Sequence, residues 1–212
     1  MEFQLAPVEV RILGSLIEKE IATPEYYPLT LNALVNACNQ KSNREPLVEY
    51  DDETVEDALD GLRKKGLAAM LSGAGMRVPK HRQLLSEALN LGRRELALLC
   101  VLMLRGPQTA GELHSRTERL HHFADLEEVE SCAQKLMEWQ PGPLVVRLPV
   151  QPGRKEPRYV QLLSGEVPVE AAAEPVRPRE DRFSALEAEI GALRRDVEQL
   201  RQQFAEFRRQ FE

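Results

Sequence analysis

Apolar residues recur every three or four positions in several short segments of this chain, the spacing of one face of an α-helix. They predict helices over residues 7–23, 30–38 and 51–66, each with a proline or a capping residue at its start. Gly66 occupies the usual position of a helix C-cap. Two short apolar runs follow, at 67–71 and 76–78, and the glycines between them predict a hairpin.

The same order of signals then repeats. Helices are predicted over residues 89–104, 109–120 and from 125 to the breaker at 141–143, followed by strands at 144–148 and 158–163. The apolar stripes of the two third helices align position by position: Val55, Ala58, Leu59 and Leu62 match Val129, Cys132, Ala133 and Leu136. This correspondence indicates an internal duplication.

Three helices followed by a hairpin are typical of a winged helix, in which the hairpin covers the open side of a helix–turn–helix core. We therefore predict a mainly α protein with small β wings, built from two tandem winged-helix domains and a C-terminal coiled-coil helix. The predicted parts are residues 1–84, residues 85–164, a Pro/Ala/Glu-rich linker over 165–180, and the coiled-coil helix over 181–212.

The last 30 residues carry a heptad repeat that starts at Phe183 and runs to Phe211. Its further apolar positions are Leu186, Ile190, Leu193, Val197, Leu200, Phe204 and Phe207. β-branched residues at a with leucine at d favour a parallel homodimer, and the flanking charges agree in sign with that pairing. The alternatives are a helix that packs on its own domain and a helix that is only partly folded.

Composition narrows the function classes. The 212 residues carry a formal net charge of −6, so any contact with nucleic acid must use local basic patches rather than the overall field. The three cysteines lie in apolar helical patterns and are expected in the core. The N-terminus lacks a signal peptide and no apolar run could span a bilayer, so we expect a cytoplasmic protein. We find no nucleotide-binding loop, nucleophile elbow or metal-ligand spacing, and expect no catalytic residues, metal or cofactor.

Two segments resemble a known family. The run YYPLTLNALVNACNQKSNREP at 26–46 and the run RGPQTAGELHSRTERLHHFADLEEVE at 105–130 resemble the YceH-like family of uncharacterised bacterial proteins. The resemblance covers roughly residues 5–165. It implies tandem winged helices in a bacterial cytoplasmic protein and no established activity.

Winged helices most often bind DNA, with the third helix in the major groove and the wing on the phosphates. The candidate phosphate contacts here are Lys41, Arg44, Arg77, Lys80, Arg82, Arg154, Lys155 and Arg158. Both third helices are acidic, however, which disfavours the usual recognition-helix mode. The sequence thus predicts a DNA-binding or regulatory protein that uses its wings. The alternative is a protein-interaction adaptor dimerised by its tail.

The polar loop from Asn39 to Pro46 has two interpretations. Asparagine and serine favour hydrogen-bonded turns, so the loop can hold the fold together. Loops also carry binding residues, so it can contact a ligand or a partner.

Overall fold

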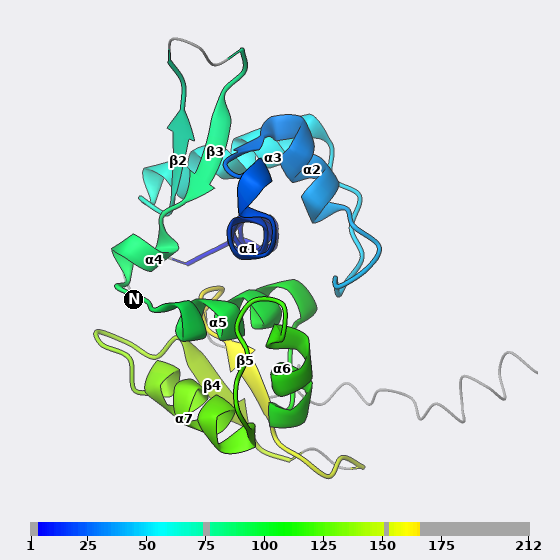
Figure 1. The fold of residues 1–212 in the computed structure, drawn as a ribbon, viewed down its shortest axis with the longest axis vertical. Helices are drawn as coiled ribbons and strands as arrows, with labels where there is room; N and C mark the ends of the chain where they lie inside the picture. Colours follow the sequence, from blue (N-terminus) through cyan, green and yellow to red (C-terminus); the bar gives the residue numbers. More distant parts are fainter. Residues whose placement is uncertain (1–3, 74–76, 151–152, 166–212) are drawn as a thin grey trace, which may run out of the picture. The chain divides into compact units, whose positions relative to one another are not determined.

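The computed structural model describes residues 4–73, 77–150 and 153–165, which form mainly helices and two small antiparallel sheets. This confirms the predicted mixture of helices and β hairpins. The predicted coiled coil and nearly all of the linker lie outside the described residues. We refer to residues 4–84 as the N-terminal half and to residues 85–165 as the C-terminal half (Figure 1).

The N-terminal half contains α1 (Pro7–Ala22), a 3₁₀ turn η1 (Pro24–Tyr26), β1 (Leu29–Thr30), α2 (Leu31–Cys38), α3 (Asp52–Lys64), β2 (Ala68–Leu71) and β3 (Lys80–Gln83). The predicted caps are confirmed. The Thr30 hydroxyl accepts a hydrogen bond from the backbone N–H of Ala33, and the Asp51 carboxylate accepts one from Thr54.

The return strand of the first hairpin lies at residues 80–83, so its predicted position at 76–78 is wrong. Pro79 has no backbone N–H and precedes the strand, whereas His81 and Gln83 alternate inward from it and are buried. β3 pairs with β2 and also with β1, a short strand that the apolar pattern does not reveal.

The C-terminal half contains α4 (Leu85–Ala88), α5 (Arg93–Arg105), α6 (Ala110–Thr117), α7 (Leu126–Met137), β4 (Val145–Leu148) and β5 (Arg158–Gln161). The helix predicted from residue 89 begins only at residue 93, because Asn90 has a φ of 49° and Gly92 is the N-cap. Thr109 and Asp125 cap α6 and α7 as predicted.

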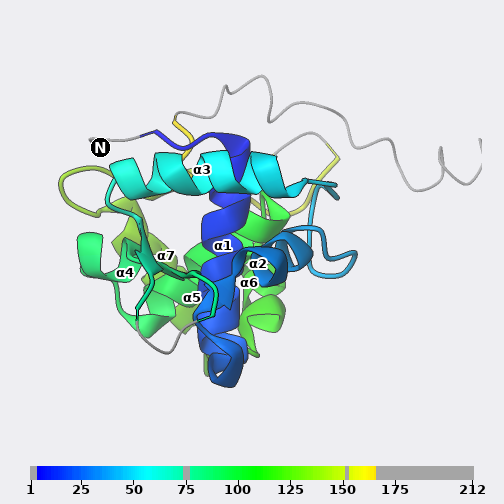
Figure 2. The same cartoon turned by 90° about the horizontal axis from the view of Figure 1, so that it is seen from above.

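The two halves pack through their first helices, α1 and α5 (Figure 1). Helices α2 and α3 contact α1, and α6 and α7 contact α5. Figure 2 shows α3 lying across α1. Gly14 permits the close approach, because a Cβ at this position would lie 3.0 Å from Leu104 and 3.1 Å from Met103. The aligned stripes of α3 and α7 are buried, as predicted.

A Glu–Lys ion pair joins the first and third helices in each half. The buried Glu9 carboxylate of α1 lies 2.5 Å from Lys65 Nζ, which follows α3. The buried Glu95 carboxylate of α5 lies 2.7 Å from Lys135 Nζ on α7. The two lysines are not equivalent in the alignment of α3 with α7, since Lys135 corresponds to Gly61, but both pairs connect a first helix to a third helix.

The three cysteines are buried, as expected of core residues. Burial raises the pKa of the Cys38 thiol to about 11 and that of Cys132 to about 12. No helix among residues 4–73, 77–150 and 153–165 is long and apolar enough to cross a bilayer.

Candidate nucleic-acid interface

The third helices present carboxylates to solvent in both halves. Asp52, Glu53, Glu56 and Asp57 are exposed on α3, and Glu127 and Glu130 are exposed on α7. Phosphates approaching either helix face would meet negative charge. The geometry therefore disfavours insertion of α3 or α7 into the major groove, as the sequence indicated.

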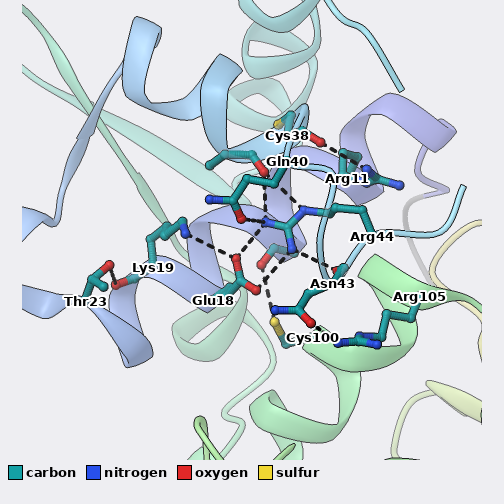
Figure 3. A network of polar contacts seen from close by, with 12 residues as sticks. Arg11, Glu18, Lys19, Thr23, Cys38, Gln40, Asn43, Arg44, Cys100 and Arg105 are labelled. Atoms are coloured by element: carbon teal, nitrogen blue, oxygen red, sulfur yellow. Dashed lines mark hydrogen bonds and ion pairs between the residues drawn. The ribbon is translucent and has the colours of Figure 1, made fainter. Parts of the chain in front are cut away.

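Arg44 is buried inside the fold (Figure 3). Two of its guanidinium nitrogens donate to the Glu18 carboxylate at 3.1 and 2.6 Å. The same side chain donates to the carbonyl of Ala37 near the end of α2 and to the carbonyl of Asn43. Its exposure is 6%, and its charge is already paired. This burial rules out the predicted role of Arg44 as a phosphate contact.

Several further polar contacts of residues 39–50 close the loop on itself and on α1. The Asn39 side chain both donates to the Tyr50 carbonyl and accepts from the Tyr50 N–H, at 2.7 and 2.9 Å. Arg11 of α1 donates to the carbonyls of Cys38 and Pro46. Burial, with Arg44 nearby, lowers the pKa of Arg11. These contacts support the structural interpretation of the loop.

Lys41 is the exposed cation of this loop. It lines a hollow of about 230 Å³ together with Asn39, Leu47, Val48 and Glu49. Lys41 therefore remains available for an anion, whereas its neighbour Arg44 does not.

The first hairpin carries three of the predicted cations, of which one is paired with a carboxylate. Arg77 is exposed and Lys80 is half-buried, and neither forms an ion pair with the residues that the structure describes. Arg82 lies 2.6 Å from Glu87, and this hydrogen bond raises the pKa of Arg82. His81 is buried, and that burial lowers its pKa. Two of the predicted hairpin cations are thus available, and Arg82 is neutralised.

Arginines from three elements converge beside the second hairpin. Arg105 ends α5, Arg116 lies on α6, and Arg154 and Arg158 belong to the β4–β5 hairpin. We call these four residues the arginine cluster. Glu112 on α6 lies 3.6 Å from Arg116 and 3.5 Å from Arg158, so both guanidinium groups share one carboxylate.

Gln108 organises the centre of the cluster. It is 2% exposed, and its backbone pairs with Tyr159 of β5 through hydrogen bonds of 3.1 and 2.7 Å. Its side-chain oxygen accepts from Arg116, and its side-chain nitrogen donates to the carbonyl of Arg105 at 3.0 Å. Arg158 donates to the neighbouring carbonyl of Pro107 at 2.7 Å. The buried Gln108 amide therefore holds Arg116 against the end of α5, and the adjacent Pro107 carbonyl holds Arg158.

The electrostatics of the cluster reflect an excess of positive charge. Burial lowers the pKa of Arg105, and the neighbouring Arg116 lowers it further. Burial also lowers the pKa of Arg158; Glu112 opposes this shift, while Arg154 and Arg116 add to it. Arg158 Nε is buried without a hydrogen-bond partner among the described atoms. An anion bound here would relieve the repulsion between these guanidinium groups.

The sequence identified Arg154, Lys155 and Arg158 but missed Arg105 and Arg116. Both missed residues lie on helices otherwise interpreted through their apolar stripes. Counting from the capping threonines, Arg116 occupies the position in α6 that Ala37 occupies in α2. The aligned repeat therefore contained the signal, as a basic residue replacing a small one at a position close to the hairpin.

The chain belongs to a family of bacterial proteins described as "Protein of unknown function, DUF480", whose model matches residues 5–154. It is 56% identical over 195 residues to a UPF0502 protein of Solibacter usitatus, covering 90% of this chain and 93% of that protein. It is 53% identical to a UPF0502 protein of Geobacter sulfurreducens, covering 90% of each chain. A UPF0502 protein of Pelobacter propionicus is 58% identical over 167 residues, covering 79% of this chain and 75% of its own. The resemblance to the YceH-like family is thereby confirmed.

Proposed function

We propose that this protein binds the phosphate backbone of duplex DNA through the arginine cluster. One observation carries the proposal: guanidinium groups from α5, α6 and the β4–β5 hairpin converge, and two of them share the single carboxylate of Glu112. Guanidinium groups match phosphate oxygens in charge and geometry, and arginine is the usual residue for this contact.

The surroundings of the cluster favour binding that does not depend on base sequence. The exposed carboxylates of α7 oppose entry of that helix into the major groove, where bases are read. Contacts to phosphates position a protein on DNA but carry no sequence information directly. We therefore expect similar affinity for unrelated duplexes and a steep dependence on salt.

In this proposal the two halves are the two tandem winged helices that the sequence predicts. Each half has three helices followed by an antiparallel hairpin, and each third helix has an acidic N-cap and a buried stripe. In this arrangement the β4–β5 hairpin acts as the wing that contacts phosphates. Lys155, exposed on that hairpin, extends the arginine cluster outward.

The test is a titration of two unrelated labelled duplexes of equal length with the full chain, followed by fluorescence anisotropy at several salt concentrations. We expect equal affinities and a linear fall of log K with log salt, whose slope is about −0.9 for each phosphate neutralised. Absence of binding at the lowest salt would contradict the proposal. A strong preference for one duplex would contradict binding through the phosphate backbone alone.

A second candidate function rests on the exposed carboxylates of α3 and α7. A protein-interaction adaptor would use these faces against a basic partner, with electrostatic complementarity setting its association rate. The titration separates the two candidates, because an adaptor of this kind predicts no binding to DNA.

We further propose that the tail makes the protein a parallel homodimer, which would present two arginine clusters to one duplex. The proposal rests on the heptad pattern of residues 183–211. Leu193→Asp places a charge at a d position and is expected to give the mass of a monomer in light scattering. A variant that keeps the mass of a dimer would contradict it.

A further inference from the structure

The loop between α2 and α3 reaches from the N-terminal half to the arginine cluster. Asn43 Oδ1 accepts a hydrogen bond from Arg105 Nη2, the one side-chain hydrogen bond that Arg105 donates within the described part of the chain (Figure 3). Next to it, the backbone N–H of Glu45 donates to the carbonyl of Leu104 at 2.8 Å. The loop is therefore attached to the last turn of α5 by a side chain and by its backbone.

The position of Asn43 is itself fixed from within the N-terminal half. The Asn43 carbonyl accepts a hydrogen bond from the buried Arg44 at 3.0 Å, and Arg44 is held by Glu18 of α1. Asn43 has a φ of 60°, a backbone conformation that asparagine tolerates better than most residues. The chain of contacts thus runs from α1 through the loop to a guanidinium group of the cluster.

We propose that Asn43 is a positioning residue for the phosphate-binding surface, acting through Arg105. Without this acceptor, the Arg105 side chain would be free to rotate and would have to be ordered at the moment of binding. This inference rests on the proposed DNA binding. It assigns the loop, which otherwise has a structural role, a function in holding one arginine ready for a phosphate group.

The experiment is a double-mutant cycle on duplex binding with Asn43→Gly and Arg105→Ala. Glycine removes the side chain and accepts the positive φ, so the backbone of the loop is kept. Since each substitution removes one hydrogen bond to a charged group, each single variant is expected to bind roughly three- to tenfold more weakly. The double variant is expected to bind no more weakly than Arg105→Ala alone. Ser42→Ala, an exposed neighbour, is the matched control and should bind like the wild type.

The outcomes separate this inference from the proposed function. If the losses of affinity add in the double variant, Asn43 does not act through Arg105 and the inference is overturned. An Asn43→Gly variant with unchanged affinity would also overturn it. Each variant is also melted, because a loop that only stabilises the fold would lower the unfolding temperature without this coupling. A wild-type protein that does not bind the duplex would overturn the proposed function and the inference together.

Discussion

The two halves share a framework of caps and ion pairs but use arginine in opposite ways. In the N-terminal half, Arg44 is buried and faces the carboxylate of Glu18. In the C-terminal half, Arg116 and Arg158 are partly exposed and share Glu112 between them. A paired buried charge is committed to contacts within the fold, whereas an unbalanced charge near the surface is free to bind an anion.

The difference arises at equivalent positions. Leu29 and Ala37 in the N-terminal half correspond to Gln108 and Arg116 in the C-terminal half, each counted from the capping threonine of its second helix. Leu29 and Ala37 are buried in the core, and the loop after α2 lies against the Ala37 carbonyl. Gln108 instead holds Arg116 toward the hairpin. Substitutions at two positions of a repeat thus separate a structural half from a candidate binding half.

The largest expected effect tests the structural role of arginine in the N-terminal half. Arg44→Ala leaves the partly buried Glu18 carboxylate with Lys19, 3.6 Å away, as its remaining ion-pair partner and removes the hydrogen bonds to the Ala37 carbonyl. We expect this to lower the free energy of unfolding by about 3 kcal/mol. Denaturant unfolding measures this change. Lys41→Ala, on the same loop but exposed, should stay within about 0.5 kcal/mol of the wild type. Equal effects of the two substitutions would remove the distinction between buried and surface cations.

A second effect concerns the ion pair between Glu95 and Lys135 in the C-terminal half. Burial alone would raise the pKa of Glu95, but hydrogen bonds from Lys135 and from its own backbone outweigh burial and lower it. Since its folded pKa lies below its unfolded pKa, this group stabilises the fold above the ordinary value of 4.5, and that contribution is lost as the pH falls through the folded pKa.

Melting curves of Glu95→Gln between neutral pH and pH 3 are expected to show a weaker dependence on acid than those of the wild type. Glu130→Gln removes an exposed carboxylate from α7 and serves as the control, with the acid dependence preserved. A Glu95→Gln variant that follows the wild-type curve would contradict the assignment.

The smallest effect sharpens the charge argument for the arginine cluster. Burial lowers the pKa of both Arg105 and Arg158, and the exposed Glu45 carboxylate opposes this lowering, so it offsets part of the positive charge. Glu45→Gln is expected to tighten duplex binding about twofold at low salt, the size of one screened surface interaction. Glu49→Gln, exposed on the same loop, should not change the affinity. A Glu45→Gln variant that binds the duplex more weakly than the wild type would contradict the proposal that this carboxylate offsets positive charge in the arginine cluster.

The sequence predicted the helices other than the short α4, their caps and most hairpin strands, because these follow from local periodicity and capping chemistry. Strand β1 was missed because two residues are too short to show alternation, and the start of α5 was misplaced because the left-handed Asn90 interrupts an apolar run. Arg44 was assigned to the surface because its burial depends on Glu18, 26 residues earlier in the chain. The aligned repeat pointed to Arg116, whereas Arg105 could be recognised only after the fold brought α5, α6 and the second hairpin together.

The central claim is that the second hairpin, and not the first, carries the phosphate contacts. The most direct measurement compares the salt dependence of duplex binding for two matched variants, Arg154→Ala/Lys155→Ala and Arg77→Ala/Lys80→Ala. Both remove two cations from a hairpin. The first variant is expected to bind more weakly, with a slope of log K against log salt shallower by about 1 to 2, and the second is expected to match the wild type. Equal losses of affinity, or a loss confined to the first hairpin, would contradict the account.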